Sequence, residues 1–441
     1  TFEQLFTTLT SNPPFPWQRQ LYDRFVADRP DNIPQVADLP TGLGKTSVIA
    51  IWLAALITRP MQIPRRLIYV VNRRTVVDQT TAEVERLRRN LSRLGPGPVS
   101  SLGVSTLRGQ FADNREWSQD PTRPAVVCGT VDLIGSRLLF DGYRIGFRSR
   151  PLHAAFLGQD ALLIHDEAHL EPAFQTLIET IEEEQKKERR RNGEPPWPGF
   201  RVMALSATAR ERGKEDDAVD TGFFGLTPEE QEVPSRIPDP PREPIHHAWR
   251  RLSARKSVSL RAVETDKEAP HYIAELALEH RDTGLAVIVF VRTLDALNSL
   301  YKRLTDSKKG VSTRNVQQLT GTMRGFERDQ LVNFDPVFAR FVPASDRRKD
   351  LRPAEGTVYL ICTSAGEVGV NLSADHMVCD LSTFDSMAQR LGRVNRFGDR
   401  RDTRVDVVYP KAFDDKSKLT PAREATLALL RELHGDGSPR A

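Results

Sequence analysis

Short apolar runs rich in β-branched residues alternate with longer amphipathic runs along the first half of the chain. The short runs lie at residues 35–39, 67–71, 125–128, 161–164 and 201–205. The longer runs between them lie at residues 46–57, 75–94, 131–140 and 172–188. Runs of these two lengths are typical of buried strands and of helices. Because strand and helix alternate, the pattern predicts an α/β fold with a parallel sheet flanked by helices.

The composition changes after residue 209. Residues 211–220 are rich in charge, and residues 227–244 are dense in proline, with five prolines between residues 234 and 244. Proline removes a backbone donor and fixes φ, so we predict that this second stretch forms a linker without regular structure.

The alternation restarts beyond the prolines. Strands are predicted at residues 286–291, 357–362, 376–381 and 405–409, and helices at residues 272–280, 294–305 and 386–396. The predicted organisation is an α/β domain at residues 1–225, a proline-rich linker at 226–248, a second α/β domain at 249–412 and a helical tail at 413–441.

The composition limits the kinds of protein to which the chain can belong. The chain has 441 residues, of which 39% are hydrophobic and 28% charged, as in globular proteins of two to three domains. No apolar run approaches the roughly 20 residues that span a bilayer, so no membrane association is expected. The net charge of +4 permits nucleic-acid binding without requiring it. Single cysteines at positions 128, 362 and 379 are predicted to be small buried hydrophobes in a reducing compartment.

A glycine-rich segment follows the first predicted strand. Gly42 and Gly44 let successive backbone N–H groups face one concavity, where an anion fits. Lys45 can reach phosphate oxygens, and the Thr46 hydroxyl can ligate Mg²⁺. Leu39 stands where the general P-loop pattern has glycine, so this is a partial match, and an ordinary turn before a helix is the alternative.

Two adjacent acids, Asp166 and Glu167, end the predicted strand at residues 161–164. In a site for a magnesium nucleotide, one carboxylate holds the metal and the next orients the attacking water. A solvated acidic loop is the alternative. The glycine-rich loop in the same alternating domain favours the nucleotide site.

Four segments in this order resemble a superfamily 2 helicase. They are Thr-Gly-Leu-Gly-Lys-Thr at 41–46, Asp-Glu-Ala-His at 166–169, Ser-Ala-Thr at 206–208, and Gln-Arg-Leu-Gly-Arg-Val-Asn-Arg at 389–396. The P-loop of that family begins with a small or apolar residue, which accommodates Leu39. The resemblance implies a P-loop NTPase built from two tandem RecA-like domains.

Within that family, residues 69–79, 128–132 and 385–390 resemble the CRISPR-associated helicase of type I interference systems, and residues 152–158 resemble its subtype G (formerly U) branch. That family normally carries a metal-dependent nuclease domain built on a His-Asp doublet. Here the doublet, His165 and Asp166, lies inside the acidic segment. We therefore expect the nuclease to be absent from this chain and supplied in trans or by a missing C-terminal segment.

The resemblance implies ATP and Mg²⁺ as cofactors and assigns roles to the first domain. Glu167 would orient water, and Thr46 and Asp166 would hold Mg²⁺. Gln18 would read the adenine edge, although a helix start explains Gln18 equally well. Nucleotide binding falls to Thr41, Gly42, Leu43, Gly44, Lys45, Thr46 and Ser47, and coupling of nucleotide state to domain closure falls to His169, Ser206 and Thr208.

The second domain would complete the catalytic set. Arg393 and Arg396 are predicted on one helix face, aimed at the γ-phosphate, with Gln389 one turn earlier contacting the nucleotide or His169. Solvated helix arginines are the alternative. Asn371 stands where many relatives have an acid, which leaves a nucleotide role for Asn371 or Glu367 open.

Polar residues just after strands would hold a single DNA strand by its phosphates, independently of base sequence. Each of them alone is as consistent with a helix cap. They are Arg73, Thr75, Thr130, Arg292, Thr320, Thr363 and Ser364.

The resemblance implies an ATP-dependent, 3′-to-5′-type translocase on single-stranded DNA that unwinds duplex DNA in type I CRISPR interference. It would act in a prokaryotic cytoplasm with an RNA-guided surveillance complex, opening and closing about the proline-rich linker. Two alternatives stay within the enzyme class, an RNA helicase and a duplex translocase of a restriction system. A third is an ATP-gated DNA clamp that does not unwind.

Overall fold

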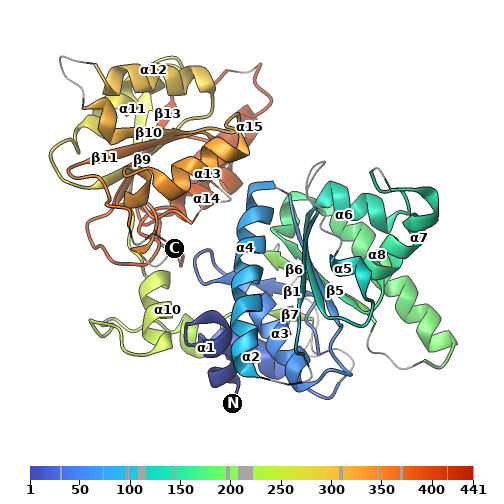
Figure 1. The fold of residues 1–441 in the computed structure, drawn as a ribbon. Helices are drawn as coiled ribbons and strands as arrows, with labels where there is room; N and C mark the ends of the chain where they lie inside the picture. The colour runs from blue at the N-terminus through green and yellow to red at the C-terminus, as the bar shows by residue number, and fades with distance from the viewer. Residues whose placement is uncertain are drawn as a thin grey trace. The chain divides into compact units, whose positions relative to one another are not determined.

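The computed structural model describes residues 1–29, 32–72, 74–95, 97, 99–107, 116–143, 145–194, 199–206, 222–306, 311–344, 347–348, 350–367, 371–414 and 416–440. The chain divides into two compact units, Thr1–Trp249 and Arg250–Ala441. Each unit contains one sheet with helices on both faces (Figure 1). The predicted α/β fold is confirmed.

The sheet of the first unit is parallel throughout, as predicted. The strands lie in the order β3-β4-β2-β5-β6-β1-β7, so β6 separates β1 from β5. Their bounds are β1 Val36–Asp38, β2 Arg66–Val71, β3 Gly103–Leu107, β4 Ala125–Thr130, β5 Ala161–Asp166, β6 Phe200–Ser206 and β7 Phe223–Phe224. The glycine-rich loop after β1 and the acids after β5 therefore meet at one edge of the sheet, on either side of β6.

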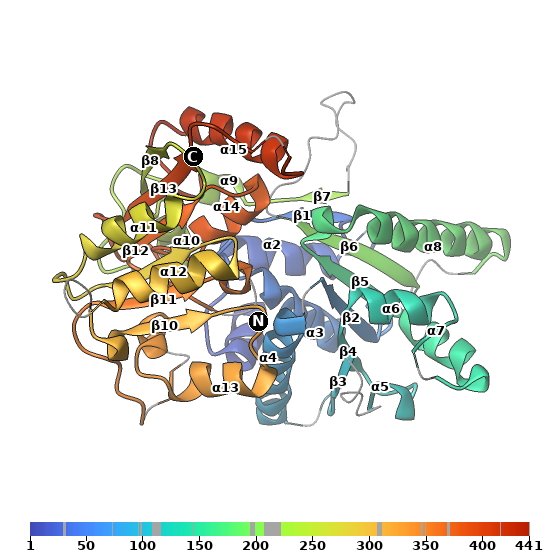
Figure 2. The ribbon, with the colours of Figure 1, turned by 90° about the horizontal axis from the view of Figure 1, so that it is seen from above.

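Successive residues of each strand contribute to opposite faces of this sheet. Leu67 and Tyr69 of β2 join the core beneath one set of helices, whereas Ile68 and Val70 join the core beneath the other set. The first set is α1 Phe2–Thr10, α2 Pro16–Phe25, α3 Val48–Thr58 and α4 Arg74–Leu91. The second set, on the other side of the sheet in Figure 2, is α5 Glu116–Gln119, α6 Val131–Leu138, α7 Arg150–Gly158 and α8 Pro172–Arg191.

The second unit repeats this design with a parallel sheet in the order β10-β11-β9-β12-β13-β8. The strands are β8 Ser257–Val263, β9 Ala286–Phe290, β10 Val316–Leu319, β11 Val358–Cys362, β12 His376–Asp380 and β13 Arg404–Pro410. One face packs on α11 Ala269–Leu278 and α12 Leu294–Leu304. The other face packs on α13 Gly325–Phe334, α14 Phe384–Leu391 and α15 Thr420–Glu432 (Figure 1).

The proline-dense segment is not free of regular structure, so that prediction was wrong. It contains the short helix α9, Pro228–Gln231, and the start of α10, Pro244–Leu252. A proline begins each helix, a position where the missing N–H costs no helical hydrogen bond. Thr227 caps α9 by accepting a hydrogen bond from the Glu230 backbone N–H at 3.2 Å. Between these two helices, residues 232–243 have no helix or strand, as predicted, and the contact boundary between the units falls inside α10.

The predicted helix at residues 386–396 is also wrong at its end. Helix α14 stops at Leu391, with Gly392 as its C-cap. Val394 then forms a parallel bridge with Ala374, and Asn395 adopts a left-handed backbone with φ of 44°. Arg393 and Arg396 therefore follow the helix, and their directions are set by a turn.

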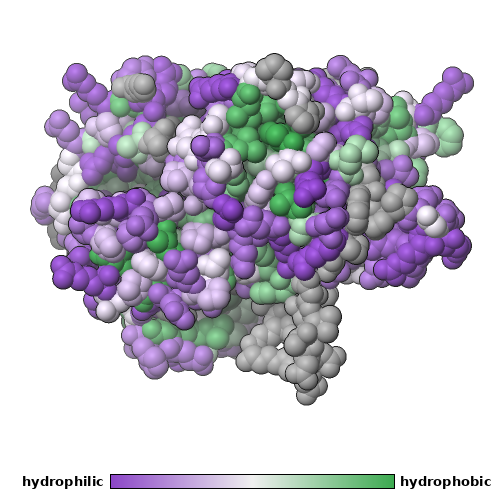
Figure 3. Space-filling model, turned by 90° about the horizontal axis from the view of Figure 1, so that it is seen from below, coloured by the Kyte–Doolittle hydropathy of each residue, from purple (hydrophilic) through white to green (hydrophobic). Residues whose placement is uncertain are grey.

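Cys128, Cys362 and Cys379 are all buried, as predicted. The interior of the sheets contrasts with the face in Figure 3, where hydrophilic residues predominate around smaller hydrophobic patches. Among the described residues, no helix combines the length and the apolar character needed to cross a bilayer.

Candidate active site

The glycine-rich loop begins where β1 ends. Leu39 continues the ladder, since its backbone N–H donates to the Ser206 carbonyl at 3.0 Å. Leu39 and Leu43 are buried and anchor the loop in the core, while Gly42 and Gly44 have φ of 95° and 80°. Residues with a side chain rarely adopt such φ angles, so this curved backbone requires glycine at both positions. The loop leads into a short 3-10 turn, Lys45–Ser47, and then α3.

Lys45 meets the acidic segment directly. Its Nζ lies 3.3 Å from Glu167 Oε1, and the two side chains are 10% and 17% exposed. Residues 122 positions apart in sequence are thus brought together by the neighbouring strands β1, β6 and β5. A phosphate entering the loop would compete with Glu167 for this ammonium group.

Asp166 lies beside this ion pair and is held by Tyr69. The Tyr69 hydroxyl donates to Asp166 Oδ2 at 2.8 Å, and the Thr46 side chain is a second hydrogen-bonding neighbour of that hydroxyl. Burial, and then the charge of Glu167, raise the pKa of Asp166 to about 6, with Lys45 opposing the shift. Burial and Asp166 likewise raise the pKa of Tyr69.

These contacts test whether the predicted Mg²⁺ ligands fit that ion. The hydroxyl of Thr46 and the carboxylate of Asp166 both neighbour one phenol oxygen, and both are oxygen ligands of the kind Mg²⁺ takes. The residues present therefore fit a magnesium ion shared with phosphates. Within the described residues, no group of three or more His, Cys, Asp or Glu side chains is placed to hold a metal alone.

His169 and Ser206, both predicted to couple nucleotide state to closure, lie near each other. Nδ1 of His169 is 3.6 Å from Glu167 Oε2 and 3.5 Å from Ser206 Oγ. Ser206 ends β6, the strand between the loop and the acids. Glu167 itself has a left-handed backbone, with φ of 52°, which turns its carboxylate back towards Lys45. Thr208 lies outside the described residues.

Gln18 packs beside the glycine-rich loop and is 4% exposed. Its Oε1 accepts from the Phe15 backbone N–H at 2.7 Å, and its Nε2 donates to Ser47 Oγ at 2.6 Å. Gln18 thus ties the start of α2 to the start of the helix that follows the loop. The sequence allowed two roles for Gln18, an adenine contact or a helix start. Its position beside the glycine-rich loop is compatible with both, and the hydrogen bond from the Phe15 N–H is the one expected of a helix start.

His165, the first residue of the His-Asp doublet, faces away from Asp166. Its Nδ1 is 2.8 Å from Gln175 Oε1, and its ring meets Phe174 edge-on. Burial lowers the pKa of His165 to about 4, so the imidazole is neutral. His165 is therefore a residue of the core.

In the second unit, Arg390 is the centre of a buried charge network that the sequence did not reveal. Its Nε donates to Glu367 Oε1 at 2.9 Å, and one terminal nitrogen donates to Asp380 Oδ1 at 3.1 Å. The exposed fraction is 1% for Arg390 and 2% for Glu367. Burial lowers the pKa of Arg390, but the two carboxylates outweigh it and raise the pKa overall. Glu367, whose nucleotide role was left open, is a partner of this arginine.

Arg393 is anchored to the same segment. Its Nε and one terminal nitrogen donate to the Glu367 carbonyl at 2.8 and 2.7 Å. The backbone N–H of Arg396 donates to Ser373 Oγ at 3.2 Å, and Arg396 is half-buried. Gln389 lies on α14, before the turn that carries both arginines. The shared helix face predicted for Arg393 and Arg396 is replaced by this anchored turn.

Several residues predicted to contact DNA lie at the carboxyl ends of strands. Thr130 ends β4, while Thr320 and Thr363 follow the adjacent strands β10 and β11, and Ser364 is exposed in the next turn. Arg73 lies outside the described residues, as does the side chain of Thr75, near the start of α4.

Arg292 also follows a strand, but carboxylates engage its guanidinium. Nε donates to Asp380 Oδ2 at 3.1 Å, and a terminal nitrogen donates to Asp266 Oδ1 at 2.9 Å. Asp266 in turn accepts two hydrogen bonds from Arg423. Arg292 therefore fixes the strand ends around it, and a phosphate would have to displace two acids to reach it.

A glycine-rich loop with a lysine, and an acid pair two strands away in a parallel sheet, define a P-loop NTPase. Family models agree with this class. Residues 15–216 match the DEAD/DEAH box helicase family, and residues 283–399 match the C-terminal part of the CRISPR-associated nuclease/helicase Cas3 family. Together the models place the chain among the superfamily 2 helicases of the Cas3 type.

Solved structures share the tandem RecA-like fold. Cas3 from T. fusca is 17% identical, with a TM-score of 0.60 over 98% of this chain and 51% of that chain. The Mycobacterium smegmatis helicase Lhr, bound to ssDNA and AMP-PNP, is 16% identical, with a TM-score of 0.55 over 97% of this chain and 49% of that one. A variant of S. cerevisiae Dbp5, bound to RNA and ADP BeF3, is 17% identical, with a TM-score of 0.55 over 98% and 90%.

The chain thus spans about half the length of Cas3 and Lhr. A sequence search of curated proteins finds no match.

Tyr69 was not assigned a role from sequence, yet it positions Asp166. We expect Tyr69→Phe to weaken Mg²⁺ activation of ATP hydrolysis about 10-fold, because the ligand's supporting hydrogen bond is lost. The measurement is ATPase rate against Mg²⁺ concentration at fixed ATP. An unchanged Mg²⁺ midpoint would show that the phenol does not orient Asp166.

The Arg390 network predicts a large stability difference between two arginines. Arg390→Leu leaves the buried Glu367 carboxylate without its cation, while Asp380 keeps only Arg292, and is expected to cost about 3–5 kcal/mol in the free energy of unfolding. Arg348→Leu, at an exposed ion pair with Asp350, is expected to leave the urea midpoint nearly unchanged, because solvent screens that pair. Urea unfolding of both variants checks this, and equal losses would refute the buried network.

Proposed function

We propose that this chain is an ATP-driven translocase on single-stranded DNA that unwinds duplex DNA in type I CRISPR interference. The observation that carries the ATPase part is the Lys45 ammonium 3.3 Å from Glu167, with Asp166 on the adjacent residue. The Cas3-type family membership supports the biological setting. Movement of the 3′-to-5′ type, the RNA-guided surveillance complex and a nuclease acting in trans follow from that membership as parts of the proposal.

In the proposed reaction, the backbone of residues 41–47 and the Lys45 ammonium bind the phosphates of ATP. Thr46 and Asp166 would hold Mg²⁺, which neutralises phosphate charge when bound. Once phosphate takes Lys45, Glu167 is released to orient the attacking water. Gln18, already bonded to Ser47, would lie beside the adenine.

Arg393 and Arg396 are proposed to stabilise the charge that develops on the γ-phosphate, with Gln389 nearby. Guanidinium groups in this role are worth about 10³-fold or more in rate. The hydrogen bonds of Arg393 to the Glu367 carbonyl give it a fixed direction, which favours a preorganised catalytic role over a solvated one. The contacts of His169 with Glu167 and Ser206 suit coupling of nucleotide state to Ser206 and Thr208.

Strand binding is proposed at the carboxyl ends of the strands. Hydroxyl groups and backbone amides there would bind phosphates without reading bases. The positions are Arg73, Thr75, Thr130, Thr320, Thr363 and Ser364, with Arg292 as a support for the neighbouring loops. The fold alone is compatible with DNA or RNA, because Lhr is bound to ssDNA and Dbp5 to RNA.

The experiment is strand displacement combined with ATPase stimulation by single-stranded DNA, RNA and duplex DNA. The parental chain is expected to be stimulated most by single-stranded DNA and to displace a strand from a duplex with a 3′ overhang. Stimulation by RNA alone would favour an RNA helicase, and stimulation by duplex DNA alone would favour a duplex translocase of a restriction system. Hydrolysis without displacement would favour a DNA clamp.

Two variants test the roles within this reaction. Lys45→Ala is expected to abolish turnover, because the phosphates lose their cation. Arg396→Ala is expected to leave ATP binding within about twofold while hydrolysis falls about 10³-fold, since its charge acts in the transition state. Equilibrium binding of a fluorescent ATP analogue and single-turnover hydrolysis measure the two effects. Weaker binding with a parental rate at saturation would contradict the role of Arg396.

A further inference from the structure

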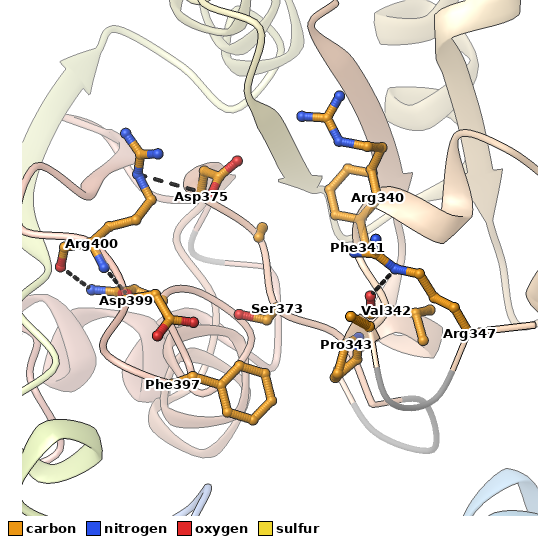
Figure 4. Close-up of a pocket in the computed structure, with 13 residues that line it drawn as sticks. Arg340, Phe341, Val342, Pro343, Arg347, Ser373, Asp375, Phe397, Asp399 and Arg400 are labelled. Atoms are coloured by element: carbon orange, nitrogen blue, oxygen red, sulfur yellow. Dashed lines mark hydrogen bonds and ion pairs between the residues drawn. The ribbon is translucent and has the colours of Figure 1, made fainter. Parts of the chain in front are cut away.

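The second unit contains a cavity of about 390 Å³ at the opposite edge of its sheet from the proposed strand contacts. It lies between residues 340–344 and Arg347 on one wall and residues from the stretch 395–400 on the other (Figure 4). Asp375, just before β12, lines it and accepts a hydrogen bond from the N–H of Ala286, the first residue of β9, at 2.8 Å. The cavity is therefore at the amino ends of β9 and β12.

The residues proposed for ATP hydrolysis do not line this cavity. Gln389, Arg393 and Arg396 are all absent from its described lining, although Asn395 and Phe397 on either side of Arg396 contribute to it. Thr320, Thr363 and Arg292 follow the carboxyl ends of their strands, at the other edge. The cavity thus has its own lining residues, but it borders the turn that carries Arg393 and Arg396, because Ser373 in its lining accepts a hydrogen bond from the Arg396 backbone N–H.

Arg340 and Arg347 form part of one wall, and among the described residues neither is ion-paired with the carboxylates of Asp375 and Asp399 across the cavity. The guanidinium of Arg340 donates to three backbone carbonyls, those of Ala354, Gly356 and Gly284, and so is fixed in place. Arg347 has a single hydrogen bond among the described residues, from Nε to the Val342 carbonyl at 2.6 Å. Within the described ranges, no hydrogen bond is found for its terminal nitrogens, which could therefore bind a ligand.

The surroundings of Arg347 favour an anion. Burial, and then the positive charge of Arg340, lower the pKa of Arg347. Both effects mean that its charge is poorly compensated by the protein, so a nearby anion would be stabilised. The planar guanidinium matches the oxygens of a phosphate.

The opposite wall offers an aromatic ring and acids that already have partners. The Arg251 guanidinium lies 5.2 Å from the centre of the Phe397 ring, and Phe397 lines the cavity. Asp399 pairs with Arg250 at 3.2 Å, and Asp375 lies 3.9 Å from Arg400 Nε. The paired arginines offset the charge of these two carboxylates, whose oxygens can still accept hydrogen bonds from hydroxyl or amino groups.

We propose that this cavity binds a nucleotide, with its phosphate on Arg347 and its base against Phe397. A volume of about 390 Å³ lies within the range of small-ligand sites. Stacking on an aromatic ring is open to every base, so the site would have little base preference. The nucleotide is a unit of a single strand or a free nucleoside monophosphate, two sources with the same chemistry.

The test uses the full chain with two probes. The first is a fluorescent 12-residue oligothymidine, followed by anisotropy at several salt concentrations. The second is dTMP, titrated calorimetrically in excess AMP-PNP, which occupies the proposed ATP site. The variants are Arg347→Gln, which keeps a donor for the Val342 carbonyl, and Phe397→Leu.

Arg348→Gln is the matched control. Arg348 is the next residue along the chain, but it pairs with Asp350 and lies over Phe334 outside the cavity. Thermal unfolding of all variants confirms that they fold. If a strand is the source, Arg347→Gln weakens oligothymidine binding about 10-fold and lowers the salt slope by about 0.7. Phe397→Leu then weakens binding about fivefold without changing the slope.

If a free nucleotide is the source, the same two variants weaken dTMP binding and leave oligothymidine binding unchanged. Either result supports the site. Binding of both probes equal to that of Arg348→Gln, or failure of the parental chain to bind either probe, overturns it. The proposed helicase function is judged separately, because strand displacement can fail while dTMP binding persists, and the reverse.

Discussion

The contact between Lys45 and Glu167 is the interaction on which the first unit's chemistry depends. Two carboxylates side by side in a largely buried position repel each other and lose hydration, which is why the pKa of Asp166 is raised. The Lys45 ammonium and the Tyr69 hydroxyl offset part of that cost. This arrangement suits a ligand that brings a metal ion with its phosphates, because the cation would relieve the repulsion between the carboxylates while the phosphates bind Lys45.

In the second unit the buried charge that needs compensation is positive, and carboxylates compensate it. A buried arginine, Arg390, is compensated by Glu367 and Asp380, and the backbone of Glu367 then directs Arg393. The direction of Arg393 is thus set by hydrogen bonds to a neighbouring loop. Both units use a parallel sheet to bring charges from distant segments to one edge, where they compensate each other.

The sequence predicted strands that are continuous apolar runs and helices that are long amphipathic runs, since length and period identify both. It missed β3, β8 and β10, in which polar residues such as Ser105, Ser259 and Gln317 interrupt the apolar run. It misplaced the end of α14 because the bridge from Val394 to Ala374 is a contact beyond the local pattern.

The site could be predicted as far as local motifs extend. The loop and the acid pair are contiguous in sequence, and the structure brings Lys45 and Glu167 together as the motif reading requires. The supporting contacts could not be predicted, because Tyr69 reaches Asp166 only through the register of β2 against β5. A tyrosine in an otherwise aliphatic strand was the available signal.

The most direct measurement of the central claim is single-turnover hydrolysis by Glu167→Gln compared with its ATP affinity. The substitution keeps the side chain's shape and removes the charge that holds Lys45 and orients water. We expect ATP binding at least as tight as in the parental chain, because Lys45 is freed for phosphate, with hydrolysis reduced at least about 100-fold. Hydrolysis near the parental rate, or loss of ATP binding, would contradict it.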